Sequence, residues 1–239
     1  MLQNKKILNL NLKHFLKNRL KSKIYFAVIY GSYAYNISKK NSDVDILVVS
    51  EHSNKKDIDK FTDFVISLHH KFGLGIDNEV PFHKKLILRK DLFEKGIKGG
   101  GFSKRNGMFF IPKIKKTRRF LSSKKVVMRL VLNVLTTKNI FIMGDYNYYK
   151  KKRLEAAISL VRIIFSARNI SKCTVKDFID MIFKDKVVGE GEFYLGYKDI
   201  PIIRRDLLNL FGNVFNLLVK KRVLIKKDEF YLLPNKGMQ

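Results

Sequence analysis

The sequence predicts an α/β (α+β) fold, with a small mixed β-sheet flanked by helices in residues 1–112 and a helical domain in residues 113–239. Two observations support this prediction. In the first half, short runs of β-branched and aromatic residues alternate with segments whose apolar residues recur at helical spacing. From about residue 119 onward, helical spacing dominates. A chain of 239 residues can form one large domain or two smaller ones.

Each element of the first half follows from a local pattern. The predicted elements are a helix over 5–22, strands over 24–30 and 43–50, a helix over 54–71, a short strand at 86–88 and a short helix at 90–95. Ser53 or Asn54 is expected to cap the second helix. A glycine-rich stretch from Gly96 to about residue 112 lacks the Gly-Lys-Ser/Thr ending of a P-loop. We expect it to be a mobile loop or a linker between domains.

The second half shows mainly helical periodicity. Its predicted elements are helices over 121–138, 146–168 and 201–221, another helix that begins after Thr174, and a C-terminal β-hairpin that turns at residues 227–228. We expect these elements to form a domain that follows the sheet.

Two polar motifs lie at the ends of the first two predicted strands. Gly31-Ser32 follows the first strand, and Asp43-Val44-Asp45 begins the second after a spacer of ten residues. Glycine allows a backbone to approach a phosphate closely, and Ser32 adds a hydroxyl. Asp43 and Asp45 are two residues apart on the predicted strand, so their side chains point to the same face. Two carboxylates on one face suit Mg²⁺. Ordinary turns would also explain both motifs, but strands disfavour aspartate, so we favour a functional site.

This arrangement resembles the signature of the DNA polymerase β-like nucleotidyltransferase superfamily, and its spacing is closest to that of the small minimal and antibiotic-modifying members. The motif covers the 15 residues from Gly31 to Asp45. The resemblance implies a catalytic domain over roughly the first half of the chain, which transfers a nucleoside monophosphate from a triphosphate to an acceptor. It implies that Asp43 and Asp45 hold Mg²⁺ and that Gly31 and Ser32 hold the β/γ phosphates.

The resemblance also implies a third carboxylate on a neighbouring strand, which completes the metal site or accepts a proton from the attacking hydroxyl. Asp77 and Glu79 are the two candidates. We favour Glu79 narrowly, because Glu79-Val80 is similar to a glutamate that precedes a small apolar residue in several antibiotic-modifying relatives. The other carboxylate is expected to pair with a nearby lysine. His69 and His70 are adjacent on a predicted helix, point to different faces and therefore form a poor metal pair.

Composition limits the class of protein and the kind of partner. No apolar run is long enough to span a membrane, and a single cysteine, Cys173, excludes a disulfide framework, so we expect a cytoplasmic location. The formal net charge of +28 attracts polyanionic partners, which include nucleoside triphosphates, RNA and acidic proteins, but a solvated basic surface explains the charge equally well. Basic clusters occur at residues 113–119, 150–153 and 220–222.

These features together predict a Mg²⁺-dependent, ATP-binding or other NTP-binding nucleotidyltransferase. Its hydroxyl acceptor is expected to be RNA, such as a tRNA end, or a protein, as in nucleotidyltransferase toxins. An antibiotic nucleotidyltransferase of the aminoglycoside type is one alternative, although a polycationic substrate suits a +28 chain poorly. A catalytically inactive nucleic-acid-binding or toxin–antitoxin module is another. The presence of Gly31-Ser32 and of both aspartates argues against such a loss of activity.

Overall fold

The computed structural model of the protein describes residues 2–38, 42–52, 54–75, 87–100, 102–105, 108–110, 124–184 and 201–234. Its largest sheet has the strand order β3-β2-β1-β6 within these residues. The strands are β1 (Ile24–Tyr30), β2 (Asp45–Ser50), β3 (Ile87–Arg89) and β6 (Ile140–Gly144). β1 pairs antiparallel with both β2 and β6, whereas β2 and β3 are parallel. The predicted small mixed sheet is therefore confirmed.

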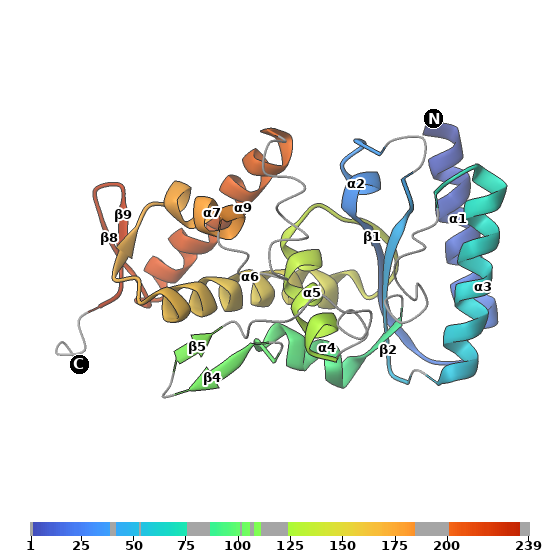
Figure 1. The fold of residues 1–239 in the computed structure, drawn as a ribbon, viewed down its shortest axis with the longest axis horizontal. Helices are drawn as coiled ribbons and strands as arrows, with labels where there is room; N and C mark the ends of the chain where they lie inside the picture. Colours follow the sequence, from blue (N-terminus) through green and yellow to red (C-terminus); the bar gives the residue numbers. More distant parts are fainter. Residues whose placement is uncertain are drawn as a thin grey trace.

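Helices cover both faces of this sheet (Figure 1). The bounds are α1 (Leu2–Arg19), α3 (Lys55–Phe72), α4 (Lys90–Ile97), α5 (Lys124–Thr136) and α6 (Tyr146–Arg168). α1 and α3 pack on the face that carries Ile29, Ile46 and Val48. α4, α5 and α6 pack on the opposite face, which carries Leu47 and Val49. This alternation is the period-2 pattern of a strand buried on both faces.

The C-terminal region lies beyond the sheet, at the end of α6 (Figure 1). It contains β7 (Lys172–Cys173), α7 (Val175–Lys184), α9 (Pro201–Lys220), β8 (Ile225–Lys227) and β9 (Phe230–Leu232). Phe178, Phe211 and Phe215 are completely buried between these elements. The rings of Phe178 and Phe211 lie 4.8 Å apart, which is typical of packed aromatic side chains. The expected hairpin is present, and β7 adds a third strand beside β9.

Two features of the middle of the chain differ from the simplest sequence interpretation. The glycine-rich stretch ends α4 instead of forming a loop, because the N–H groups of Gly99 and Gly100 donate to the carbonyls of Gly96 and Lys95. β4 (Ser103–Arg105) and β5 (Met108–Phe110) then form a hairpin. The described part of the stretch from Gly96 to residue 112 is therefore not a plain loop, and its role as a linker between domains remains a prediction.

The fourth strand of the large sheet comes from the second half of the sequence. β6 lies beside β1, with Ile140 opposite Ile29 and Phe141 opposite Val28. Buried residues form a continuous core from β1 through α5 and α6 to α9. The division of the chain at residue 112 remains a prediction. Among the described helices, none is both long and apolar enough to cross a membrane.

Candidate active site

The chain turns at Gly31 directly after β1, and Gly31 and Ser32 are the first two residues of the short helix α2 (Gly31–Ala34). Gly31 has a φ of +74°, in the left-handed region that favours glycine. A Cβ added to Gly31 would overlap Oδ2 of Asp45, and it would lie 3.3 Å from the Cγ of the same carboxylate. The backbone of the turn is thus packed directly against the Asp45 side chain, and no residue with a side chain fits there without displacing that carboxylate.

The Asp43-Val44-Asp45 motif lies at the entrance to β2. Asp45 is the first residue of the strand and pairs with Tyr30, whereas Asp43 precedes the strand. The predicted strand over 43–50 therefore begins two residues later, at Asp45. Asp43 and Asp45 are half-buried, and Val44 between them is buried against the α1 and α3 side of the sheet. Alternation places Asp45 on the same face as Leu47.

A buried histidine contacts this motif from α3. The backbone N–H of Val44 donates to Nε2 of His69, with 2.9 Å between the two nitrogens. Nδ1 of His69 donates in turn to the carbonyl oxygen of Val65 at 2.7 Å, so the two contacts require the neutral Nδ1–H tautomer. Burial lowers the pKa of His69, against the opposing influence of the Val65 carbonyl and Asp43. This side chain is a fixed hydrogen-bond acceptor beside the two aspartates.

The end of α3 makes a second contact with the same segment. Gly73 has a φ of +61° and caps the helix, which allows the chain to turn back toward β2. The N–H of Gly75 then donates to the carbonyl of Ser42 at 3.2 Å. Val44 is therefore hydrogen-bonded to the C-terminal end of α3, and Ser42 to the segment that directly follows it.

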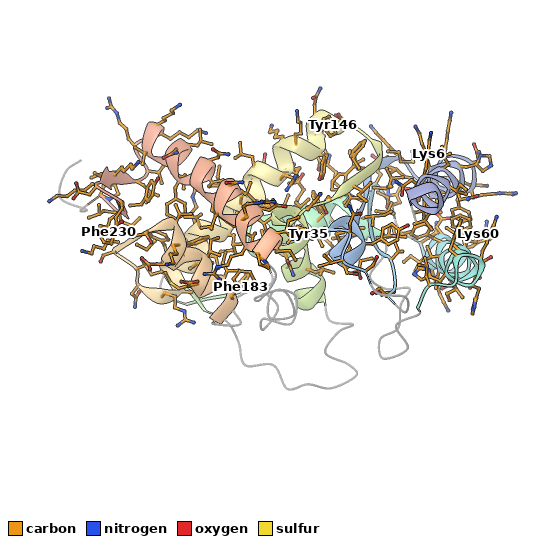
Figure 2. All side chains as sticks on the ribbon, turned by 90° about the horizontal axis from the view of Figure 1, so that it is seen from above. Lys6, Tyr35, Lys60, Tyr146, Phe183 and Phe230 are labelled. Carbon is orange, nitrogen blue, oxygen red and sulfur yellow. The ribbon has the colours of Figure 1, made fainter. Side chains whose placement is uncertain are left out.

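The residues after Gly31 are anchored to the second half of the chain. Ser32 is half-buried, and its carbonyl accepts a hydrogen bond from the N–H of Ile37 at 3.1 Å. The Tyr35 hydroxyl accepts a hydrogen bond from the N–H of Lys138 at 3.0 Å, just before β6. Burial raises the pKa of Tyr35 to about 12, so its phenol stays protonated at neutral pH. Figure 2 shows Tyr35 near the middle of the molecule, with Lys60 at one end and Phe230 at the other.

The candidates for the third carboxylate, Asp77 and Glu79, lie outside the described residues. β3 runs parallel to β2, so the chain enters β3 from the end of the sheet at which Asp45 lies. Among the residues that the structure describes, no three His, Cys, Asp or Glu side chains form a group able to hold a metal ion. The assignment of Asp43 and Asp45 to a metal site and that of the third carboxylate both remain predictions.

The basic cluster at residues 150–153 divides into two parts. Lys150 and Lys151 are exposed on α6. Lys152 is buried and donates to the carboxylates of Glu94 and Glu155 at 2.9 and 2.7 Å. Arg153 also has a structural role, because it donates to two carbonyls at the end of α5. Only the first two residues of this cluster are placed to contact a polyanion; the cluster at 113–119 lies outside the described residues.

His69 is the site residue that the sequence interpretation missed. Its position in α3 carried a signal, since Phe61, Val65 and Leu68 recur at helical spacing and place His69 on the same buried face. A histidine on an apolar helix face needs a polar partner, which the sequence could not identify because Val44 is 25 residues away. His70 is exposed, as its position on the opposite face predicts.

Comparison with known proteins supports the interpretation of this region. Residues 11–97 match a family model described as "Polymerase beta, Nucleotidyltransferase". This range includes the Gly31-Ser32 turn, the Asp43-Val44-Asp45 motif and α3 with its two histidines. Searches of curated proteins and of solved structures gave no match.

Proposed function

We propose, on the premise that residues 11–97 form a nucleotidyltransferase domain of the DNA polymerase β-like superfamily, that this protein transfers a nucleoside monophosphate from an NTP to a hydroxyl acceptor with the help of Mg²⁺. The observation that carries the proposal is the contact between Gly31 and the Asp45 carboxylate. It brings together a backbone turn suited to phosphate and a carboxylate suited to a divalent cation.

The residues present fit a magnesium ion. Mg²⁺ prefers oxygen ligands and is usually bound by one or two carboxylates together with phosphate oxygens of the substrate. Asp43 and Asp45 would supply two carboxylates, and Glu79 or Asp77 would supply the third. The ion would neutralise charge on the triphosphate. Because Gly31 has no side chain, the backbone of the turn can lie next to Asp45, and a triphosphate held by Gly31 and Ser32 would be adjacent to that carboxylate.

The proposed chemistry is an in-line displacement. The acceptor hydroxyl oxygen forms a bond to the α-phosphorus, and the bond from that phosphorus to the α–β bridging oxygen breaks, which releases pyrophosphate. The hydroxyl proton passes to a base, for which the third carboxylate is the candidate. Positioning of the triphosphate and neutralisation of its charge supply most of the rate acceleration in such reactions.

RNA is the acceptor that the charge of the chain favours. A net charge of +28 attracts a polyanion and disfavours a polycationic aminoglycoside. Exposed basic residues at the end of α9, Lys220, Lys221 and Arg222, add to this field. Contacts of this kind bind nucleic acid with an affinity that falls steeply as salt rises. We therefore propose an RNA such as tRNA as the acceptor, with a protein hydroxyl as the alternative outcome of the test.

The test is a transfer assay with each of the four α-³²P-labelled NTPs, Mg²⁺ and a cell extract, followed by nuclease or protease treatment of the labelled product. Label that ribonuclease removes identifies RNA, and label that only protease removes identifies protein. The Asp45→Asn variant should lose at least about 100-fold in transfer, equivalent to about 2.7 kcal/mol in the barrier. The absence of label with every NTP would contradict catalysis and favour an inactive binding module.

The matched control is Asp63→Asn. Asp63 is a carboxylate on the exposed face of α3, within the same domain. Its substitution changes the net charge by the same amount as Asp45→Asn and should leave transfer within about twofold, because surface substitutions usually have small effects. If the two variants had equal activity, Asp45 would have no role in the reaction.

A further inference from the structure

The entrance to β2 has a backbone donor that the sheet does not satisfy. The pairing of β1 with β2 ends at the pair Tyr30 and Asp45. The next residue after β1, Gly31, already belongs to α2, so the backbone leaves the sheet there. Val44, which would be opposite Gly31, is therefore outside the ladder, although it is 1% exposed. A buried N–H group without an acceptor is unfavourable, so the position of Val44 depends on an acceptor from elsewhere in the fold.

His69 supplies that acceptor. Its ring is 1% exposed, and Nε2 accepts the hydrogen bond from Val44 while Nδ1–H donates to Val65. The Val65 carbonyl is one helical turn earlier in α3, so it fixes both the tautomer and the direction of the ring. The hydrogen bond from Gly75 to Ser42 holds the other side of the same segment. The backbone on both sides of Asp43 is thus attached either to the end of α3 or to the segment that directly follows it.

We propose that His69 is a positioning residue, which holds the Val44 backbone so that the Asp43 and Asp45 carboxylates are in place before a divalent cation binds. This inference rests on the function proposed above. Groups that orient metal-binding residues typically change metal affinity or activity by about 10–100-fold when they are removed. The histidine itself contacts neither the substrate nor the cation.

Two substitutions separate the two hydrogen bonds of the ring. In His69→Gln, the side-chain oxygen reaches the position of Nε2 and accepts the hydrogen bond from Val44. In His69→Asn, the shorter amide reaches the position of Nδ1, keeps the donor to Val65 and loses the acceptor for Val44. His70→Asn is the matched control, since it places the same residue at the adjacent, exposed position of α3.

The experiment measures three quantities for the full chain and each variant: Mn²⁺ affinity by electron paramagnetic resonance, KM and kcat for NMP transfer, and thermal unfolding. All assays are run well below the lowest melting temperature. His69→Asn should bind Mn²⁺ at least about tenfold more weakly, with a raised KM for the metal–NTP complex. The Mn²⁺ affinity and KM of His69→Gln should stay within about threefold of the wild-type values. Those of His70→Asn should equal the wild-type values.

The possible failures are distinguishable. If the wild type transfers NMP and Asp45→Asn does not, but folded His69→Asn matches His69→Gln in Mn²⁺ affinity and KM, then the positioning role is wrong and the proposed function stands. If the wild type and Asp45→Asn are equally inactive and bind Mn²⁺ equally, the proposed function fails and the inference about His69 fails with it. Rescue by glutamine but not by asparagine supports the inference.

Discussion

The two ends of the molecule are built in different ways. Around α7 and α9, the core consists of buried aromatic and aliphatic side chains, which include Phe178, Phe211 and Phe215. At the entrance to β2, by contrast, half-buried aspartates flank Val44, a glycine with positive φ contacts a carboxylate, and a histidine is completely buried. Aspartate at the start of a strand and a completely buried histidine both depart from the usual preferences for such positions, and the positive φ at Gly31 is one that glycine adopts most readily.

We attribute this difference to two roles: the aromatic core stabilises the fold, whereas the entrance to β2 is the candidate site. Departures from local preference reduce stability and persist where function or long-range contacts require them. Substitutions in the aromatic core should therefore reduce stability and leave the metal affinity of the folded protein unchanged. Substitutions at the entrance to β2 should have their larger effect on metal affinity and transfer, and a smaller effect on stability.

The largest expected effect on stability is that of Phe215→Ala. Phe215 is fully buried, and its ring lies 5.3 Å from that of Phe178 and 4.8 Å from that of Tyr231. Removing it should lower the free energy of unfolding by about 3–5 kcal/mol through lost burial and a cavity. Chemical denaturation measures this change. Mn²⁺ affinity of the folded variant should equal that of the wild type; a parallel loss of affinity would show that the two regions are coupled.

Gly31→Ala should have a smaller effect on stability and a much larger one on activity. The alanine would carry a strained φ and would press on the Asp45 carboxylate, at a cost of about 1–3 kcal/mol. Because displacement of a catalytic group by about 1 Å can reduce rates by about 100-fold, transfer should fall by that order. Denaturant titration and the NMP-transfer assay measure the two effects.

Two other glycines are matched controls for Gly31. Gly73 has a φ of +61° but no heavy atom near its added Cβ, so Gly73→Ala tests the backbone strain alone, at about 1 kcal/mol. Gly212 lies within α9, again with open space, and Gly212→Ala should stabilise the helix by roughly 0.5–1 kcal/mol. If Gly73→Ala reduced transfer as much as Gly31→Ala, contact with Asp45 would not explain the loss.

The smallest effect is expected for Glu94→Gln, at a polar contact between α4 and α6. Burial acts to raise the pKa of Glu94, but the hydrogen bonds from Lys152 and Tyr148 outweigh it, so the pKa is lowered overall. A carboxylate with a lowered folded-state pKa contributes stability above its unfolded pKa, near 4.5, and loses it as pH falls through the folded value.

Thermal or chemical unfolding between about pH 7 and pH 3 measures this contribution. At neutral pH, Glu94→Gln should be less stable than the wild type by about 1 kcal/mol or less, because the Glu94 side chain is still 26% exposed. The difference between the two proteins should shrink as the pH falls below 4.5. A difference that stayed constant over this range would mean that the charge of Glu94 does not contribute.

Local sequence patterns predicted most of the individual elements. The strand over 24–30 and the helix over 146–168 were predicted with the bounds that the structure gives to β1 and α6. Asn54, one of the two residues expected to cap the helix over 54–71, is the N-cap of α3. Such features depend on residues that are close in the chain, where periodicity and capping preferences act. The Gly31-Ser32 and Asp43-Val44-Asp45 motifs were likewise visible, although their roles remain predictions.

Contacts between distant residues were decided only by the tertiary structure. Nothing in the sequence near residue 140 indicates that β6 pairs with β1. The hydrogen bond from Val44 to His69 likewise depends on α3 packing against the sheet in one particular register. Local patterns specify which face of an element is apolar, but the choice of partner depends on the combined free energy of packing and hydrogen bonding over the whole fold. The sequence thus determined the elements and the candidate motifs, and the tertiary structure determined that Gly31, Asp45 and His69 lie together at the entrance to β2.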